Sequence, residues 1–125
     1  MIQVTAAVIE QDDKFLIVRR KKGKSNEHKW EFPGGKIEPN ETPQQCLARE
    51  LHEELGISAQ VDEYLTESRF HYRDIEYCLM AYRTRWVSGE YELRDHDRLE
   101  WVTTSELSQY DFTEADVKIV SFLQQ

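Results

Sequence analysis

The chain has 125 residues and a formal net charge of −8, with 39% hydrophobic and 32% charged residues. These values are ordinary for a soluble globular protein that buries a core, and they predict one domain over residues 1–125. The acidic balance excludes a protein that coats a nucleic acid polymer, because neutralising its phosphates needs a basic surface. It leaves room for a small phosphorylated ligand whose charge is balanced by metal ions.

The sequence also bears on location. No segment approaches the apolar length of a membrane span, and residues 1–4 lack the basic-then-apolar pattern of a secretory signal. Cys46 and Cys78 stand far apart without a CxxC pair, so they are interpreted as buried thiols in a reducing compartment. We therefore expect a cytoplasmic protein with no membrane partner. A monomer fits the sequence, which does not determine the oligomeric state.

The first third of the chain predicts three strands and a loop. Residues 4–9 form a largely apolar run with β-branched side chains, which is typical of a buried strand. A turn at 11–13 leads into a return strand over 15–18. The polar, basic segment 21–29 is predicted to be a loop, and a short strand follows at 30–32.

Residues 42–55 carry the clearest helix signal. Thr42 is a good N-cap, Pro43 suits the first helical position, and Gln45 completes a capping box. Gly56 stands where a helix usually ends. The apolar stripe of this helix consists of leucines spaced four residues apart, namely Leu47, Leu51 and Leu55.

The second half predicts two long strands, 61–72 and 75–87, around a turn at Arg73-Asp74. A short strand over 99–102 and a helical turn through Leu107, capped by Thr103 or Thr104, come next. Residues 113–116 open a final helix whose apolar face is expected to hold Val117, Val120 and Leu123. Because strands and helices are interleaved, we predict an α/β fold with a mixed sheet between helices.

One helix face carries three carboxylates. Glu50, Glu53 and Glu54 lie at i, i+3 and i+4, where like charges repel, and Arg49 alone cannot balance them. Such a charge run is ordinarily a solvated face. Here Gly34-Gly35 shortly precede the helix, and bare backbone can approach a ligand closely. A divalent cation would supply the missing charge, and oxygen ligands favour hard ions such as Mg²⁺.

The segment from Gly35 to Ile57 resembles the Nudix box at every specified position. It reads glycine, five residues, Glu41, seven residues, Arg49-Glu50-Leu51, one residue, Glu53-Glu54, one residue and Gly56-Ile57. Further segments resemble the MutT-like branch of the family, namely 18–20, 31–38 and the region of Trp101. Residues 110–122 resemble MutT and, more closely, bacterial CTP pyrophosphohydrolases.

This resemblance implies the Nudix-type α/β/α sandwich and a set of metal-site roles. Glu50, Glu53 and Glu54 correspond to the metal-binding glutamates, and Mg²⁺ is the implied cofactor, with Mn²⁺ as a substitute. The remaining correspondences are the Gly34 carbonyl as a backbone ligand, Arg49 as the residue that orients the glutamates, Glu41 as a supporting or metal-water contact, and Glu100 as a further acid, with Asp95 as its competitor.

The resemblance also implies hydrolysis of a nucleoside triphosphate to a monophosphate and pyrophosphate, by attack at the β-phosphorus. A hydrolase of sugar nucleotides or dinucleotides, and a non-catalytic ligand sensor, are the alternatives. The implied substrate is CTP, dCTP or a modified form, with 8-oxo-dGTP as runner-up, which suggests a role in nucleotide pool sanitation.

Three residues correspond to MutT positions near the base, and each has a structural alternative. Phe32 is otherwise a core residue, and Arg20 a solvated strand end. Asp116 either reads the base or completes a capping box with Thr113. The remaining candidates are aromatic or imidazole side chains. Trp30, Tyr72 and Tyr82 are either core or stacking residues. His28, His71 and His96 are expected at the surface, with His96 the nearest of the three to the site.

Overall fold

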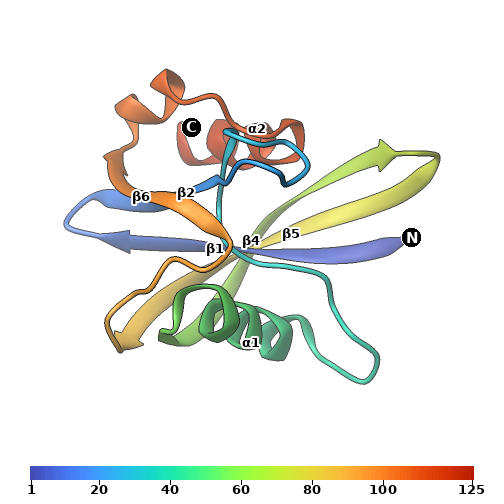
Figure 1. The fold of residues 1–125 in the computed structure, drawn as a ribbon, viewed down its shortest axis with the longest axis horizontal. Helices are drawn as coiled ribbons and strands as arrows, with labels where there is room; N and C mark the ends of the chain where they lie inside the picture. The colour runs from blue at the N-terminus through green and yellow to red at the C-terminus, as the bar shows by residue number, and fades with distance from the viewer.

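The computed structural model describes residues 1–125 and places two helices on opposite faces of a twisted mixed sheet (Figure 1). In chain order the elements are β1 (Ile2–Gln11), β2 (Lys14–Arg20), β3 (Trp30–Glu31), α1 (Pro43–Leu55), β4 (Ser58–Tyr72), β5 (Ile75–Ser88), β6 (His96–Thr103), the 3-10 helix η1 (Ser105–Gln109) and α2 (Glu114–Leu123). This arrangement confirms the predicted α/β sandwich. No helix is both long enough and apolar enough to cross a membrane.

The sheet is organised around a parallel central pair. Its order is β3-β2-β1-β5-β4, and β6 pairs with β2 outside that path. β1 and β5 run parallel, whereas the other named strand pairs are antiparallel. A parallel pair needs cover on both faces. The residues Ala6 to Ile9 of β1 are accordingly all fully buried, and they alternate between one core cluster under α2 and another under α1.

Both hairpins are closed by two-residue turns at the predicted places. Asp12 and Asp13 have φ of 52° and 62°, and Arg73 and Asp74 have φ of 51° and 63°. Two successive left-handed residues are typical of the hairpin turn whose twist matches that of the strands. The predicted strands were too short, because pairing carries β4 back to Ser58 and β6 back to His96.

Helix α1 forms as its local signals predict. The Thr42 hydroxyl accepts a hydrogen bond from the backbone N–H of Gln45, whose side chain accepts one from the Thr42 N–H. Gly56 ends the helix in the left-handed conformation at φ 71°. Leu47, Leu51 and Leu55 are fully buried against the sheet, so the predicted apolar stripe is confirmed.

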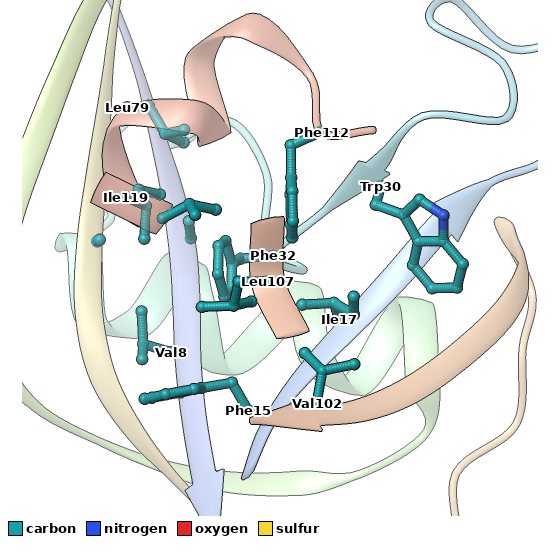
Figure 2. Close-up of a cluster of buried hydrophobic side chains, with 13 residues drawn as sticks. Val8, Phe15, Ile17, Trp30, Phe32, Leu79, Val102, Leu107, Phe112 and Ile119 are labelled. Carbon is teal, nitrogen blue, oxygen red and sulfur yellow. The ribbon is translucent and has the colours of Figure 1, made fainter. Parts of the chain in front are cut away.

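Helix α2 covers the other core cluster, in which Phe32, Phe112 and Ile119 lie together (Figure 2). The predicted apolar face of this helix is wrong at Val117, which is 49% exposed. The helix turns Asp116, Ile119 and Val120 inward instead. The Asp116 carboxylate finds partners there in the Phe32 N–H and the Thr113 hydroxyl.

Candidate active site

The glutamates on the acidic face of helix α1 differ in how far their side chains are exposed to solvent. The Glu50 side chain is 16% exposed and the Glu53 side chain 56% exposed. The Glu50 carboxylate lies against Gly35, where an added Cβ would come within 2.3 Å of Cδ. Gly35 therefore has to be a glycine for the glutamate to pack there. Burial also raises the pKa of Glu50.

Glu54 is the most buried of the three carboxyl groups. Its Oε2 is buried without a hydrogen-bond partner. Burial, reinforced by the nearby charges of Glu31, Glu50 and Asp95, raises the pKa of Glu54 to about 9, against a small opposing effect of the Gly34 backbone. A buried carboxyl oxygen without a partner, at a position that disfavours the charged form, fits a group whose counter-charge is a bound cation.

Arg49 is the protein's own cation at this face. Its guanidinium donates to both oxygens of Glu41, at 2.7 and 3.0 Å. Nη1 also donates to Glu50 at 3.0 Å and to Glu53 at 3.2 Å. Hydrogen bonds from Arg49 and from the Glu38 backbone lower the pKa of Glu41 to about 2. Arg49 thus orients Glu50 and Glu53 and leaves Glu54 without a counter-charge.

The glycine loop, residues Pro33 to Gly35, lies close to β1, and Gly35 lies against the Glu50 carboxylate. The Pro33 carbonyl accepts from Ala7 N–H at 2.7 Å, and the Gly35 carbonyl accepts from Thr5 N–H at 2.8 Å. A Cβ at Gly34 would lie 2.0 Å from the Thr5 carbonyl oxygen. Gly34 is therefore required by close backbone packing against Thr5.

This donor set fits a hard divalent cation by its chemistry. It offers carboxylate and carbonyl oxygens, one of them buried and unpartnered. The structure does not bring three acidic, histidine or cysteine side chains together as a ready-made ligand cage. Arg49 bridges Glu50 and Glu53, whereas Glu54 has no such contact with it. A hard divalent cation that keeps part of its water shell suits this arrangement better than one held by protein ligands alone.

A cleft of about 410 Å³ adjoins the glycine loop and reaches the start of α2. All three predicted base-site residues line it, namely Arg20, Phe32 and Asp116. Its aromatic wall comes from the end of the β4–β5 hairpin, where Phe70 and Tyr77 stack at 5.1 Å and Tyr72 is 46% exposed. The other two stacking candidates, Trp30 and Tyr82, are buried core residues.

Asp116 occupies the floor of this cleft and is 5% exposed. Its Oδ1 accepts from the Phe32 N–H at 2.9 Å, and the Thr113 hydroxyl donates to Oδ2. Thr113 caps α2, but Asp116 does not bind the Thr113 backbone N–H, so the capping-box alternative is not realised. Burial, with a contribution from Glu31, raises the pKa of Asp116 to about 7.

Sequence reasoning missed a charged pair at the centre of the site and misplaced a histidine. Glu31 pairs with Arg20 at 3.0 Å, and His96 Nε2 lies 2.8 Å from the Glu31 carboxylate. His96 is 5% exposed, not at the surface as expected, because its strand pairs with β2 and its ring packs against Glu31. The sequence marked Glu31 only as part of the segment 31–38. Its partner His96 lies 65 residues away in the chain.

Glu100 is not brought to the glutamate face. It pairs in register with Ile17, which belongs to the core cluster under α2, so its side chain points away from α1. It forms an ion pair with Arg98 at 2.7 Å. Its competitor Asp95 is the closer acid, since its charge acts on Glu54. The expectation for Glu100 rested on the resemblance of the residues before Trp101, which does not specify the face of β6 that Glu100 occupies.

The fold does not by itself specify an activity, and comparison with known proteins supplies the family. A model described as NUDIX domain matches residues 1–123, and the chain belongs to this family of hydrolases.

The relatives agree with that assignment. The CTP pyrophosphohydrolase of Escherichia coli K12 is 38% identical over 96% of this chain and 89% of its own. The 8-oxo-dGTP diphosphatase of the same organism is 30% identical over 99% of this chain and 97% of its own. A solution structure of the E. coli ORF135 protein superposes with a TM-score of 0.88 at 37% identity, over 97% of this chain and 86% of the other.

Proposed function

We propose that the protein is a Mg²⁺-dependent nucleoside triphosphate pyrophosphohydrolase that releases pyrophosphate and a nucleoside monophosphate. The observation that carries the proposal is the continuity of the site. Glu31 lines the same cleft as Asp116, and its side chain points toward the helix face that carries Glu54 with its unpartnered oxygen. A ligand that has phosphates at one end and a base at the other fits this arrangement.

The roles follow from the contacts. The cation would be held by the Gly34 carbonyl and by the carboxylates of Glu50, Glu53 and Glu54. The bound cation would neutralise charge on the phosphate oxygens. Arg49 orients Glu50 and Glu53 through its own hydrogen bonds. The exposed Glu53 carboxylate is available to accept the proton of the attacking water. Electrostatic stabilisation of the transition state is the main requirement for hydrolysing a phosphoanhydride bond.

The base preference rests on Asp116. Above its raised pKa of about 7, the Asp116 carboxylate is ionised and only accepts hydrogen bonds, so it then favours a base edge that presents donors. Cytosine offers an amino group, and guanine offers its ring N–H and amino group. The names of the two E. coli relatives point to the same bases. We therefore propose CTP, dCTP or modified forms as substrates, with 8-oxo-dGTP as runner-up, and a role in clearing such nucleotides from the pool.

A nucleotide panel tests the function. Purified protein with Mg²⁺ should release pyrophosphate from cytosine or oxidised guanine triphosphates faster than from UTP, UDP-sugars or ADP-ribose. In H₂¹⁸O, attack at the β-phosphorus should place the label in pyrophosphate. Faster turnover of a sugar nucleotide would contradict the substrate class. Label in the monophosphate would contradict only the point of attack.

Replacement of Asp116 tests the base reader. Asp116→Asn keeps the size of the side chain but lets it donate as well as accept, so the ratio of kcat/KM for dCTP over dUTP should fall by roughly tenfold. Asp116→Ala should flatten the same ratio, and melting curves will show whether it remains folded. Mg²⁺ dependence should persist in both variants. An unchanged ratio in Asp116→Asn would mean that Asp116 only connects Thr113 and the Phe32 backbone.

A further inference from the structure

Glu31 has a carboxylate held in place from two sides. Arg20 Nη1 donates to its two oxygens at 3.2 and 3.0 Å, and His96 Nε2 donates to Oε2 at 2.8 Å. Arg20 is itself fixed, because its Nε donates to the Ser25 carbonyl at 2.6 Å. The His96 side chain is only 2% exposed. An ordinary surface ion pair has no such buried support, so the pocket wall is built to fix this carboxylate.

The position of Glu31 is intermediate between the two ends of the site. Its register partner Val18 belongs to the core cluster under α1, so the Glu31 side chain points toward the glutamate face. The next residue, Phe32, packs in the cluster under α2, and its N–H binds Asp116. Glu31 therefore adjoins both the glutamate face and the Asp116 end of the cleft, between the proposed phosphate end and base end.

The carboxylate also keeps an unused acceptor. Two carboxylate oxygens offer about four acceptor sites, of which Arg20 and His96 occupy three. The Glu31 side chain is 17% exposed, and it lines the cleft. Phosphate oxygens cannot donate to it. The part of a nucleotide between base and phosphates is the sugar, whose hydroxyls donate, and carboxylates serve as ribose-hydroxyl acceptors in dinucleotide-binding folds.

We propose that Glu31, positioned by Arg20 and His96, accepts a hydrogen bond from a sugar hydroxyl of the bound nucleotide and so selects substrates with an intact sugar. This inference rests on the proposed function, because it takes the order of phosphate, sugar and base from a nucleotide lying across the site. Neither the metal-binding glutamates nor the base reader can supply this selection.

The test compares sugars at constant base. For the wild-type protein, kcat/KM is measured with CTP, dCTP and 2′,3′-dideoxy-CTP, and with the matching guanine series. Removal of the recognised hydroxyl should lower kcat/KM by roughly ten- to a hundredfold, the scale of a hydrogen bond to a charged group. The step from CTP to dCTP reports the 2′-hydroxyl, and the step from dCTP to the dideoxy form reports the 3′-hydroxyl.

Variants then test whether Glu31 causes the hydroxyl ratio, defined as kcat/KM with the recognised hydroxyl divided by kcat/KM without it. Glu31→Met keeps the length but removes both acceptors, so the hydroxyl ratio should fall to about twofold or less, and Glu31→Gln should give an intermediate value. His96→Leu should reduce the ratio, whereas His96→Gln, which retains a donor, should restore most of it. Glu114→Gln is the matched control, because it removes an exposed carboxylate that lines the same cleft and should leave the ratio unchanged.

Binding of the monophosphates separates the two proposals. CMP, dCMP and dideoxy-CMP are titrated into the wild type and Glu31→Met, with the guanine monophosphates in parallel. If no triphosphate is hydrolysed but the hydroxyl preference in binding is lost in Glu31→Met, the proposed function fails and the role of Glu31 stands. A hydroxyl ratio near one in the wild type, an equal ratio in Glu31→Met, or no nucleotide binding at all would overturn the inference. A change in base selectivity instead would also overturn it, because it would place Glu31 at the base.

Discussion

Glu54→Gln should lower kcat by a hundredfold or more and at the same time stabilise the metal-free protein. The loss of activity is expected because the substitution removes a charge that stabilises the transition state while it keeps the size of the side chain. The gain in stability is expected because the pKa of Glu54 is raised from 4.5 to about 9 by burial and neighbouring acids. At neutral pH the wild type must take up a proton on this group or bury its charge when it folds.

The sign of the pH dependence follows from that shift. A carboxyl group whose pKa is higher in the folded state makes its full contribution to stability below pH 4.5, and this contribution is lost as the pH rises toward 9. Glutamine stays neutral throughout. The advantage of Glu54→Gln should therefore be small near pH 5 and on the order of 3 kcal/mol at pH 7. It is measured as the difference in the free energy of unfolding in EDTA across this range.

Glu53→Gln is the matched control. Its side chain is on the same helix face but is 56% exposed, so the substitution should reduce kcat without a comparable gain in stability. Near wild-type kcat in either variant would remove that residue from the proposed metal site. A stability difference for Glu54→Gln that does not change with pH would contradict the argument from burial.

Removal of divalent metal should abolish activity. The three glutamates have one protein cation among them, and Arg49 is already shared by Glu41, Glu50 and Glu53. Hydrolysis should fall to the background rate in excess EDTA and return when Mg²⁺ or Mn²⁺ is restored. Because a ligand that binds only the folded state stabilises it, Mg²⁺ should also raise the Tm of the wild type.

The Tm provides a readout that does not depend on turnover. The rise with Mg²⁺ should be smaller in Glu54→Gln, since the variant has lost one anionic ligand. Undiminished hydrolysis in EDTA would overturn the proposed mechanism. An equal rise in Tm for the wild type and Glu54→Gln would instead remove Glu54 from the cation site.

The amino-acid sequence alone determined helix α1 and the face its glutamates share. The signals are local: Thr42 and Gln45 cap the helix, Gly56 ends it, and side chains three or four residues apart necessarily lie on one face. The hairpin turn at Arg73-Asp74 is local in the same sense. Such features need few partners from elsewhere in the chain, so their spacing predicts them directly.

Only the tertiary structure decided which side chains surround the cleft. The Phe32 N–H binds the Asp116 carboxylate 84 residues away, and Asp116, not Val117, lies on the inward face of α2 with Ile119 and Val120. His96 reaches Glu31 because β6 pairs with β2, and the same pairing turns Glu100 away from α1. A strand's two faces alternate at every residue, so the face a residue occupies depends on register with a distant strand. That register is set by the packing of the whole sheet, which no local spacing in the sequence specifies.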